Sequence, residues 1–119
     1  MSSQLANVGN YVVGYLKAQA SNDIITCPAN HRINSIEIHN YSGSAITGGL
    51  KIGTTSGGTD VVAAQTVGSS SYISIADSAI LKRFFGETYG SDQALFIQAV
   101  SSWNSATINI YITMQRICP

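Results

Sequence analysis

Nine residues near the C-terminus, 107–115, alternate strictly between apolar and polar side chains. Every second position is apolar, namely Ile108, Ile110, Ile112 and Met114, and the positions between them hold Thr107, Asn109, Tyr111, Thr113 and Gln115. Successive side chains of a β-strand point to opposite faces, so this period of two predicts a strand with one buried and one exposed face. Such a strand is typical of an antiparallel sheet that covers a core.

Seven shorter stretches elsewhere in the chain have strand-like patterns and are separated by turn sequences. They are 11–18, 23–27, 33–39, 46–53, 60–67, 71–76 and 94–100. The chain also contains 15 Ile against 5 Leu, and β-branched residues are enriched in strands. We therefore expect an all-β fold made of a single antiparallel β-sandwich, with a jelly roll as the specific form.

One segment departs from the period of two. In 77–86, Asp77 or Ser78 can cap a short helix, its apolar residues form one stripe, and Gly86 suits the C-terminal end. This predicts one short helix near 78–85. The inward positions of the strands predict the core, which comprises Ile36, Ile38, Leu50, Ile52, Ile73, Ile75, Leu95, Ile97, Ile108, Ile110 and Ile112.

Length and charge limit the domain count and the partners. A chain of 119 residues has room for one core. Lys and Arg together number 6 and are scattered, and Asp and Glu also number 6. Proteins that bind nucleic acid or anionic membranes cluster their basic residues, so we expect neither partner. Charged residues make up only 10% of the chain, and a neutral surface favours association, so we expect a homo-oligomer, with a trimer favoured.

The first 20 residues differ in character from the rest. Residues 1–20 are interpreted as an N-terminal arm or first strand with an attachment role, and 21–119 as the β-sandwich domain. The first 20 residues lack the basic start and unbroken apolar run of a signal peptide. No apolar run in the chain reaches the roughly 18 residues of a membrane span.

Residue patterns for catalysis and cofactor binding are weak. The Gly-rich segment 53–59 has Thr59 where a phosphate-binding loop places Lys, which predicts a hairpin connection instead. Glu37 and His39 share one strand face, with His31 as a distant third ligand, and a polar pair on a half-exposed sheet is favoured over a metal site. We therefore expect a non-enzymatic protein without a metal or a cofactor.

Acidic and thiol side chains have structural interpretations. Asp60, Asp77 and Asp92 adjoin Gly, Ser or Thr and are interpreted as turn or cap residues. The two cysteines, Cys27 and Cys118, lack the spacing of a metal site. Free thiols are favoured, and a disulfide between them is the alternative.

Two sets of outward-pointing residues are candidates for an interface. They are Tyr11, Val13 and Tyr15 on the first strand, and Asn109, Tyr111 and Thr113 on the last. An uncharged face of this kind can meet water, another subunit or a sugar, and contact with another subunit is favoured. The six tyrosines and Trp103 could instead provide a platform on which a sugar stacks.

Several segments of the chain, taken in order, resemble those of a known class of proteins. The sequences RINSIEIHN, LKIGTTSGGTDVV, ALFIQAV with Trp103, and TINIYIT are similar to segments of small β-sandwich structural proteins of tailed bacteriophages. The resemblance covers about residues 30–116 and leaves the first 20 residues outside. It implies a non-enzymatic virion component that decorates heads or builds fibres or tail attachments, assembles in the bacterial cytoplasm and is commonly a homotrimer. The alternative hypothesis is a carbohydrate- or receptor-binding β-sandwich module.

Overall fold

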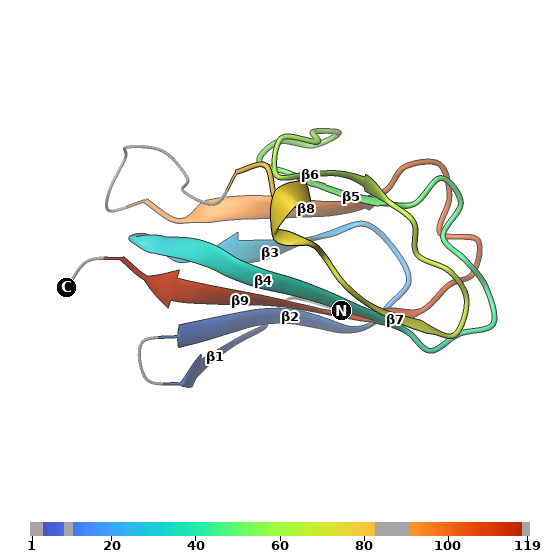
Figure 1. The fold of residues 1–119 in the computed structure, drawn as a ribbon, viewed down its shortest axis with the longest axis horizontal. Coiled ribbons are helices and arrows are strands. Elements are labelled where there is room, and N and C mark those ends of the chain that lie inside the picture. Colours follow the sequence, from blue (N-terminus) through green and yellow to red (C-terminus); the bar gives the residue numbers. More distant parts are fainter. Residues whose placement is uncertain (1–3, 9–10, 83–90, 118–119) are drawn as a thin grey trace.

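The computed structural model describes residues 4–8, 11–82 and 91–117. Within these ranges the chain forms two packed antiparallel sheets (Figure 1). Its elements are β1 (Gln4–Val8), β2 (Tyr11–Gln19), β3 (Asp23–Cys27), β4 (His31–Asn40), β5 (Leu50–Gly53), β6 (Val62–Gln65), β7 (Ser71–Ser74), the 3-10 helix η1 (Asp77–Ala79), β8 (Gln93–Ala99) and β9 (Ile108–Arg116). In the described part of the chain, no helix is long and apolar enough to cross a membrane.

The strands pair in a nested order that defines a jelly roll. The nesting runs from the ends of the chain toward the middle of the sequence. β2 pairs with β9, β3 with β8, β4 with β7 and β5 with β6, as in one long hairpin that has been folded over. Further pairing of β9 with β4 and of β8 with β5 completes the sheets, ordered β1-β2-β9-β4-β7 and β3-β8-β5-β6. The predicted sandwich and its jelly-roll form are therefore confirmed.

The core lies between the two sheets and follows the predicted alternation. Every predicted core residue is buried except Ile73, which is partly buried and packs against the others. Ile73 lies on β7, an edge strand with a neighbour on only one side. The core also contains side chains from segments with weaker patterns, including Leu16, Ile25 and Ile33, each fully buried.

The helix expected near 78–85 is shorter than its sequence pattern predicts. Only the single turn η1 forms, without a side-chain cap. Ile80 instead makes an antiparallel bridge with Val62, and both side chains are buried. Pairing with the edge of the second sheet therefore replaces a continued helix at this point. The end of the expected helix falls within residues 83–90, outside the described residues.

The N-terminal segment contributes two strands to the five-stranded sheet. β2 lies between β1 and β9, and its residues Val12 and Leu16 are part of the core. The sheets approach closely here, since a Cβ built on Gly14 would lie 2.5 Å from Ile25 Cγ2 on the opposite sheet. β2 is therefore integral to the sandwich. The attachment role expected for residues 1–20 stays a prediction.

Candidate functional site

All six predicted interface residues lie on one surface, the outward side of the five-stranded sheet. They come from two neighbouring strands, with Tyr11, Val13 and Tyr15 on β2 and Asn109, Tyr111 and Thr113 on β9. The alternate residues of both strands are buried, which places these six away from the core. We call the outward side chains of β2, β9, β4 and β7 the outer face.

Strand register places these residues directly opposite one another. Val13 pairs with Thr113 and Tyr15 pairs with Tyr111. The Tyr15 and Tyr111 ring centroids are 6.4 Å apart, and Lys17 Nζ lies 5.8 Å from the centroid of the Tyr15 ring. The two predicted sets therefore form a single uncharged surface with one lysine at its edge.

A second group of aromatic rings lies where β4 pairs with β7. His39 is opposite Tyr72, and the His39 ring centroid is 5.8 Å from those of both Tyr72 and Tyr41. Tyr72 is 60% exposed and Tyr41 is 47% exposed, values that are high for large rings. Together with Glu37, we call these residues the aromatic corner.

Glu37 fixes the position of Tyr72. The Tyr72 hydroxyl donates a hydrogen bond of 2.7 Å to Glu37 Oε2, and Ser74 Oγ donates a longer one of 3.3 Å to the same oxygen. Because the hydroxyl proton is held by the carboxylate, the pKa of Tyr72 is raised. No described residue donates a hydrogen bond to Glu37 Oε1, which leaves this oxygen open to a ligand.

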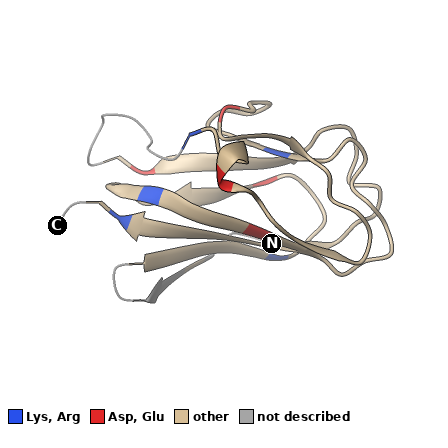
Figure 2. Cartoon of the chain, viewed as in Figure 1, with Lys and Arg blue, Asp and Glu red and all other residues tan. Residues whose placement is uncertain are grey.

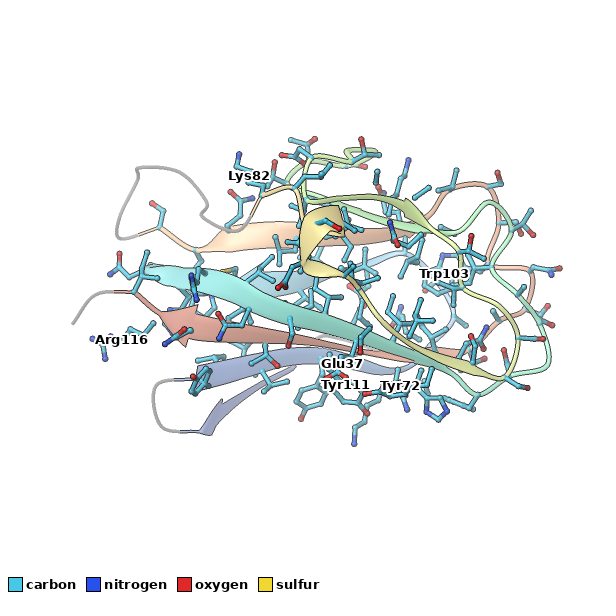
Figure 3. All side chains as sticks on the ribbon, in the orientation of Figure 1. Glu37, Tyr72, Lys82, Trp103, Tyr111 and Arg116 are labelled. Carbon is cyan, nitrogen blue, oxygen red and sulfur yellow. The ribbon has the colours of Figure 1, made fainter. Side chains whose placement is uncertain are left out.

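The two parts of the outer face are continuous. Glu37 is opposite Tyr111 on β9 and opposite Ser74 on β7. Figure 3 shows Glu37, Tyr111 and Tyr72 side by side on this face, with Trp103 away from them. The sequence pattern distinguishes Tyr111 and includes Tyr72 only among the six tyrosines of a sugar platform, although Tyr72 precedes the inward-facing Ile73 and period two places it outward.

Charge is dispersed over the described residues. Figure 2 shows acidic and basic residues spread singly over both sheets. The ion pair between Lys82 Nζ and Asp60 Oδ2, at 4.0 Å, lies outside the outer face. The outer face therefore offers mainly rings, hydroxyls and amides, with Glu37 as the carboxylate at its aromatic corner and the basic residues Lys17 on β2 and Arg32 on β4.

The three residues considered as metal ligands do not converge. Glu37 accepts a hydrogen bond from Tyr72, and the His39 ring contacts the rings of two tyrosines. His31 lies at the opposite end of β4, where its Nδ1 is 2.8 Å from the Ala29 carbonyl oxygen. No group of three potential ligands comes together among the described residues.

Trp103 has a structural position. Its Nε1 donates a hydrogen bond of 2.6 Å to Asn22 Oδ1, and its ring packs against the core. Asn22 Oδ1 also accepts a hydrogen bond from the backbone N–H of Ala99, so Asn22 joins the β2–β3 connection to the end of β8 and the segment that follows it. Trp103 is therefore separate from the tyrosines of the outer face.

The Gly-rich segment and Asp60 form the predicted hairpin connection. The segment 53–59 lies in the connection between the paired strands β5 and β6. Asp60 accepts hydrogen bonds from the Thr54 N–H at 2.8 Å and from the Thr54 hydroxyl at 2.6 Å. Partial burial acts to raise the pKa of Asp60, but these hydrogen bonds outweigh it and lower the pKa below its ordinary value.

Cys27 is a buried free thiol. Its sulfur lies 3.7 Å from the Pro28 carbonyl oxygen and 3.8 Å from that of His31. Burial, and to a smaller extent the Asp92 carboxylate, raises the pKa of Cys27 to about 12. A thiol of this kind is protonated and unreactive at neutral pH. Cys118 lies outside the described residues.

Comparison of the chain with protein-family models, with curated proteins and with solved structures finds no match. The function is therefore inferred from the geometry of the outer face.

Proposed function

We propose that this protein is a non-enzymatic structural component of a bacteriophage virion that acts by assembling into a homotrimer. It would serve as a capsid decoration, a head fibre or a tail-associated protein, made and assembled in the bacterial cytoplasm. Its partners would be copies of itself and other virion proteins, such as the major capsid or tail proteins. The observation that carries the proposal is the gathering of six uncharged outward residues of β2 and β9 on one surface.

The chemistry of this surface suits contact with another protein. Tyr11 is 42% exposed, and Val13, Tyr15 and Tyr111 are partly exposed. Tyrosine is enriched in protein interfaces, where charged residues are depleted. Covering this surface removes apolar area from water without stripping water from a charge, which favours association.

The fold supports the same proposal by analogy. Jelly rolls with two four-stranded sheets are used in viral capsids, and also in lectins and cupins. A fold shared by such different proteins does not identify a function. The surface residues carry the proposal, and the fold is compatible with it.

The oligomeric state tests the proposed assembly. Size-exclusion chromatography with light scattering should give about three times the 12.6 kDa chain mass. Val13→Lys places a charge on this surface beside the Tyr15–Tyr111 pair and should shift the mass toward that of the monomer. Ala63→Lys, at an exposed position on β6 of the other sheet, is the matched control and should leave the oligomer intact. A monomeric native protein at millimolar concentration would refute self-association.

A separate measurement tests the virion location. Phage particles purified from the source of this sequence should contain the protein in fixed stoichiometry, as measured by quantitative mass spectrometry after density-gradient centrifugation. Its absence from particles would contradict the structural role even if the protein forms a trimer.

A further inference from the structure

Tyr72 in the aromatic corner is held by a hydrogen bond although the residue is largely exposed. Tyr72 is 60% exposed, yet the hydrogen bond from its hydroxyl to Glu37 restricts the ring. The His39 ring centroid lies 5.8 Å from the ring centroids of both Tyr72 and Tyr41. A ligand that stacks on Tyr72 therefore costs little additional side-chain entropy, because this ring is already restrained.

A hydrogen-bond acceptor lies next to the exposed rings. Glu37 Oε2 accepts the hydrogen bonds from Tyr72 and Ser74, whereas Oε1 accepts none from the described residues. An ionised carboxylate only accepts hydrogen bonds, so it selects a ligand that carries donors. Hydrogen bonds from neutral donors to a carboxylate are stronger than those between two neutral groups.

This combination matches the surface of a sugar ring. A pyranose has a C–H face that packs against an aromatic ring and a rim of hydroxyls that donate to a carboxylate. The nearby groups are also uncharged and polar, with Ser74 on β7 and Asn109 opposite His39 on β9. A corner made of rings, hydroxyls and amides with a single carboxylate complements a ligand that is apolar on its face and polar at its edge.

The negative charge of the aromatic corner restricts which saccharides can bind there. Glu37 is the acidic residue of the corner, and Lys17 lies over the Tyr15 ring on β2. A phosphate, sulfate or carboxylate on the ligand would be repelled by Glu37. The corner therefore favours a neutral saccharide over an acidic one, and over nucleic acid.

From these observations we propose that the aromatic corner, formed by Glu37, His39, Tyr41 and Tyr72, is a binding site for a neutral saccharide. The ring of Tyr72 stacks on the sugar, and Glu37 Oε1 accepts from a sugar hydroxyl. This site lies beside the proposed assembly surface of β2 and β9, and it does not require assembly.

An array of neutral and acidic oligosaccharides tests the proposal with the full-length protein. Neutral glycans built from hexoses or N-acetylhexosamines should bind, and sialylated or sulfated ones should not. The best neutral glycan is then titrated into isotopically labelled protein. Nuclear magnetic resonance shifts should be saturable and centred on His39, Tyr41 and Tyr72.

Three variants separate ring stacking from hydrogen bonding. Tyr72→Ala should weaken glycan binding by about tenfold or more, since it removes the stacking ring. Glu37→Gln keeps the shape and should weaken binding by roughly tenfold, because the sugar hydroxyl then donates to a neutral oxygen instead of a charged one. Tyr11→Ala, at an exposed tyrosine elsewhere on the outer face, should bind like the native protein. Unchanged thermal unfolding of all three confirms that each is folded.

The outcomes are distinct from those of the assembly test. Failure of every neutral glycan to bind overturns the saccharide site and leaves self-association standing. Binding that survives in Tyr72→Ala, or a preference for acidic glycans, also overturns it. Glycan binding by a Val13→Lys monomer would support the site independently of assembly.

Discussion

The Tyr15 and Tyr111 rings lie directly opposite each other on β2 and β9, with centroids 6.4 Å apart and planes inclined by 32°. This contact joins the first and last long strands of the chain on its outer face. Cross-strand aromatic pairs stabilise a sheet, and this one also unites the two predicted interface sets. The pair is therefore both a sheet contact and the centre of the proposed assembly surface.

Ile110→Ala should strongly destabilise the protein. Ile110 is fully buried between the sheets, so the substitution removes apolar contacts and leaves a cavity. The free energy of unfolding, measured by urea denaturation, should fall by about 2–5 kcal/mol. Leu81→Ala, at a position that is 62% exposed, should change it by less than about 0.5 kcal/mol. Equal losses in the two variants would show that the core is not where the structure places it.

Gly14→Ala should also destabilise the protein, for the opposite reason. The added Cβ would lie 2.5 Å from Ile25 Cγ2 on the opposite sheet, so Ile25 and the strand that carries it would have to shift. Overpacking of this kind costs about 1–3 kcal/mol. Gly43→Ala is the matched control, because a Cβ there meets nothing within 4 Å. A neutral Gly14→Ala variant in the same denaturation assay would mean that the sheets are farther apart.

Asn40→Ala should loosen one end of the sandwich. Asn40 is fully buried, and its Nδ2 donates to the Ser44 and Gly68 carbonyl oxygens at 2.7 and 3.0 Å. Its Oδ1 also accepts from the Ser42 hydroxyl at 2.6 Å. Leaving buried groups without partners costs about 1–3 kcal/mol. The control Ser69→Ala changes an exposed residue near the same turn, and thermal unfolding should distinguish the two.

Truncation should separate the roles of the first two strands. Deletion of residues 1–8 removes the edge strand β1 and should leave a domain that unfolds cooperatively. Deletion of residues 1–20 also removes β2 with the buried Leu16, so it should abolish the cooperative transition in circular dichroism. A folded domain that lacks residues 1–20 would support the interpretation of this segment as a separable attachment arm.

Stability should decline at alkaline pH because of Cys27. Its pKa rises from 9.0 to about 12 on folding, chiefly through burial, so the folded chain retains a proton that the unfolded chain releases. Its contribution is fully present below pH 9 and is lost as the pH rises toward 12, with a slope of up to about 1.4 kcal/mol per pH unit.

Urea denaturation at pH 8, 9 and 10 measures this effect. The free energy of unfolding of the native protein should fall more steeply with pH than that of Cys27→Ala. This variant lacks the thiol and keeps every other titratable group of the chain. Parallel declines in the two proteins would rule out a buried neutral thiol at this position.

The sequence by itself determined which side chains face the core and which face outward. Period two along 107–115 predicted the buried Ile108, Ile110 and Ile112, and it placed Tyr111 outside. The same reasoning predicted an all-β sandwich. These properties are local, because the alternation of side chains along a strand depends only on the strand backbone.

Only the tertiary structure decided which strands are neighbours. The pairing of β2 with β9 places Tyr15 beside Tyr111, and the pairing of β4 with β7 places Tyr72 beside Glu37. Backbone hydrogen bonds between strands are the same for every sequence, so local patterns do not specify partners. Each strand acquires its neighbours when the buried faces of all the strands pack into one core. The resulting strand order brings the residues of the outer face together.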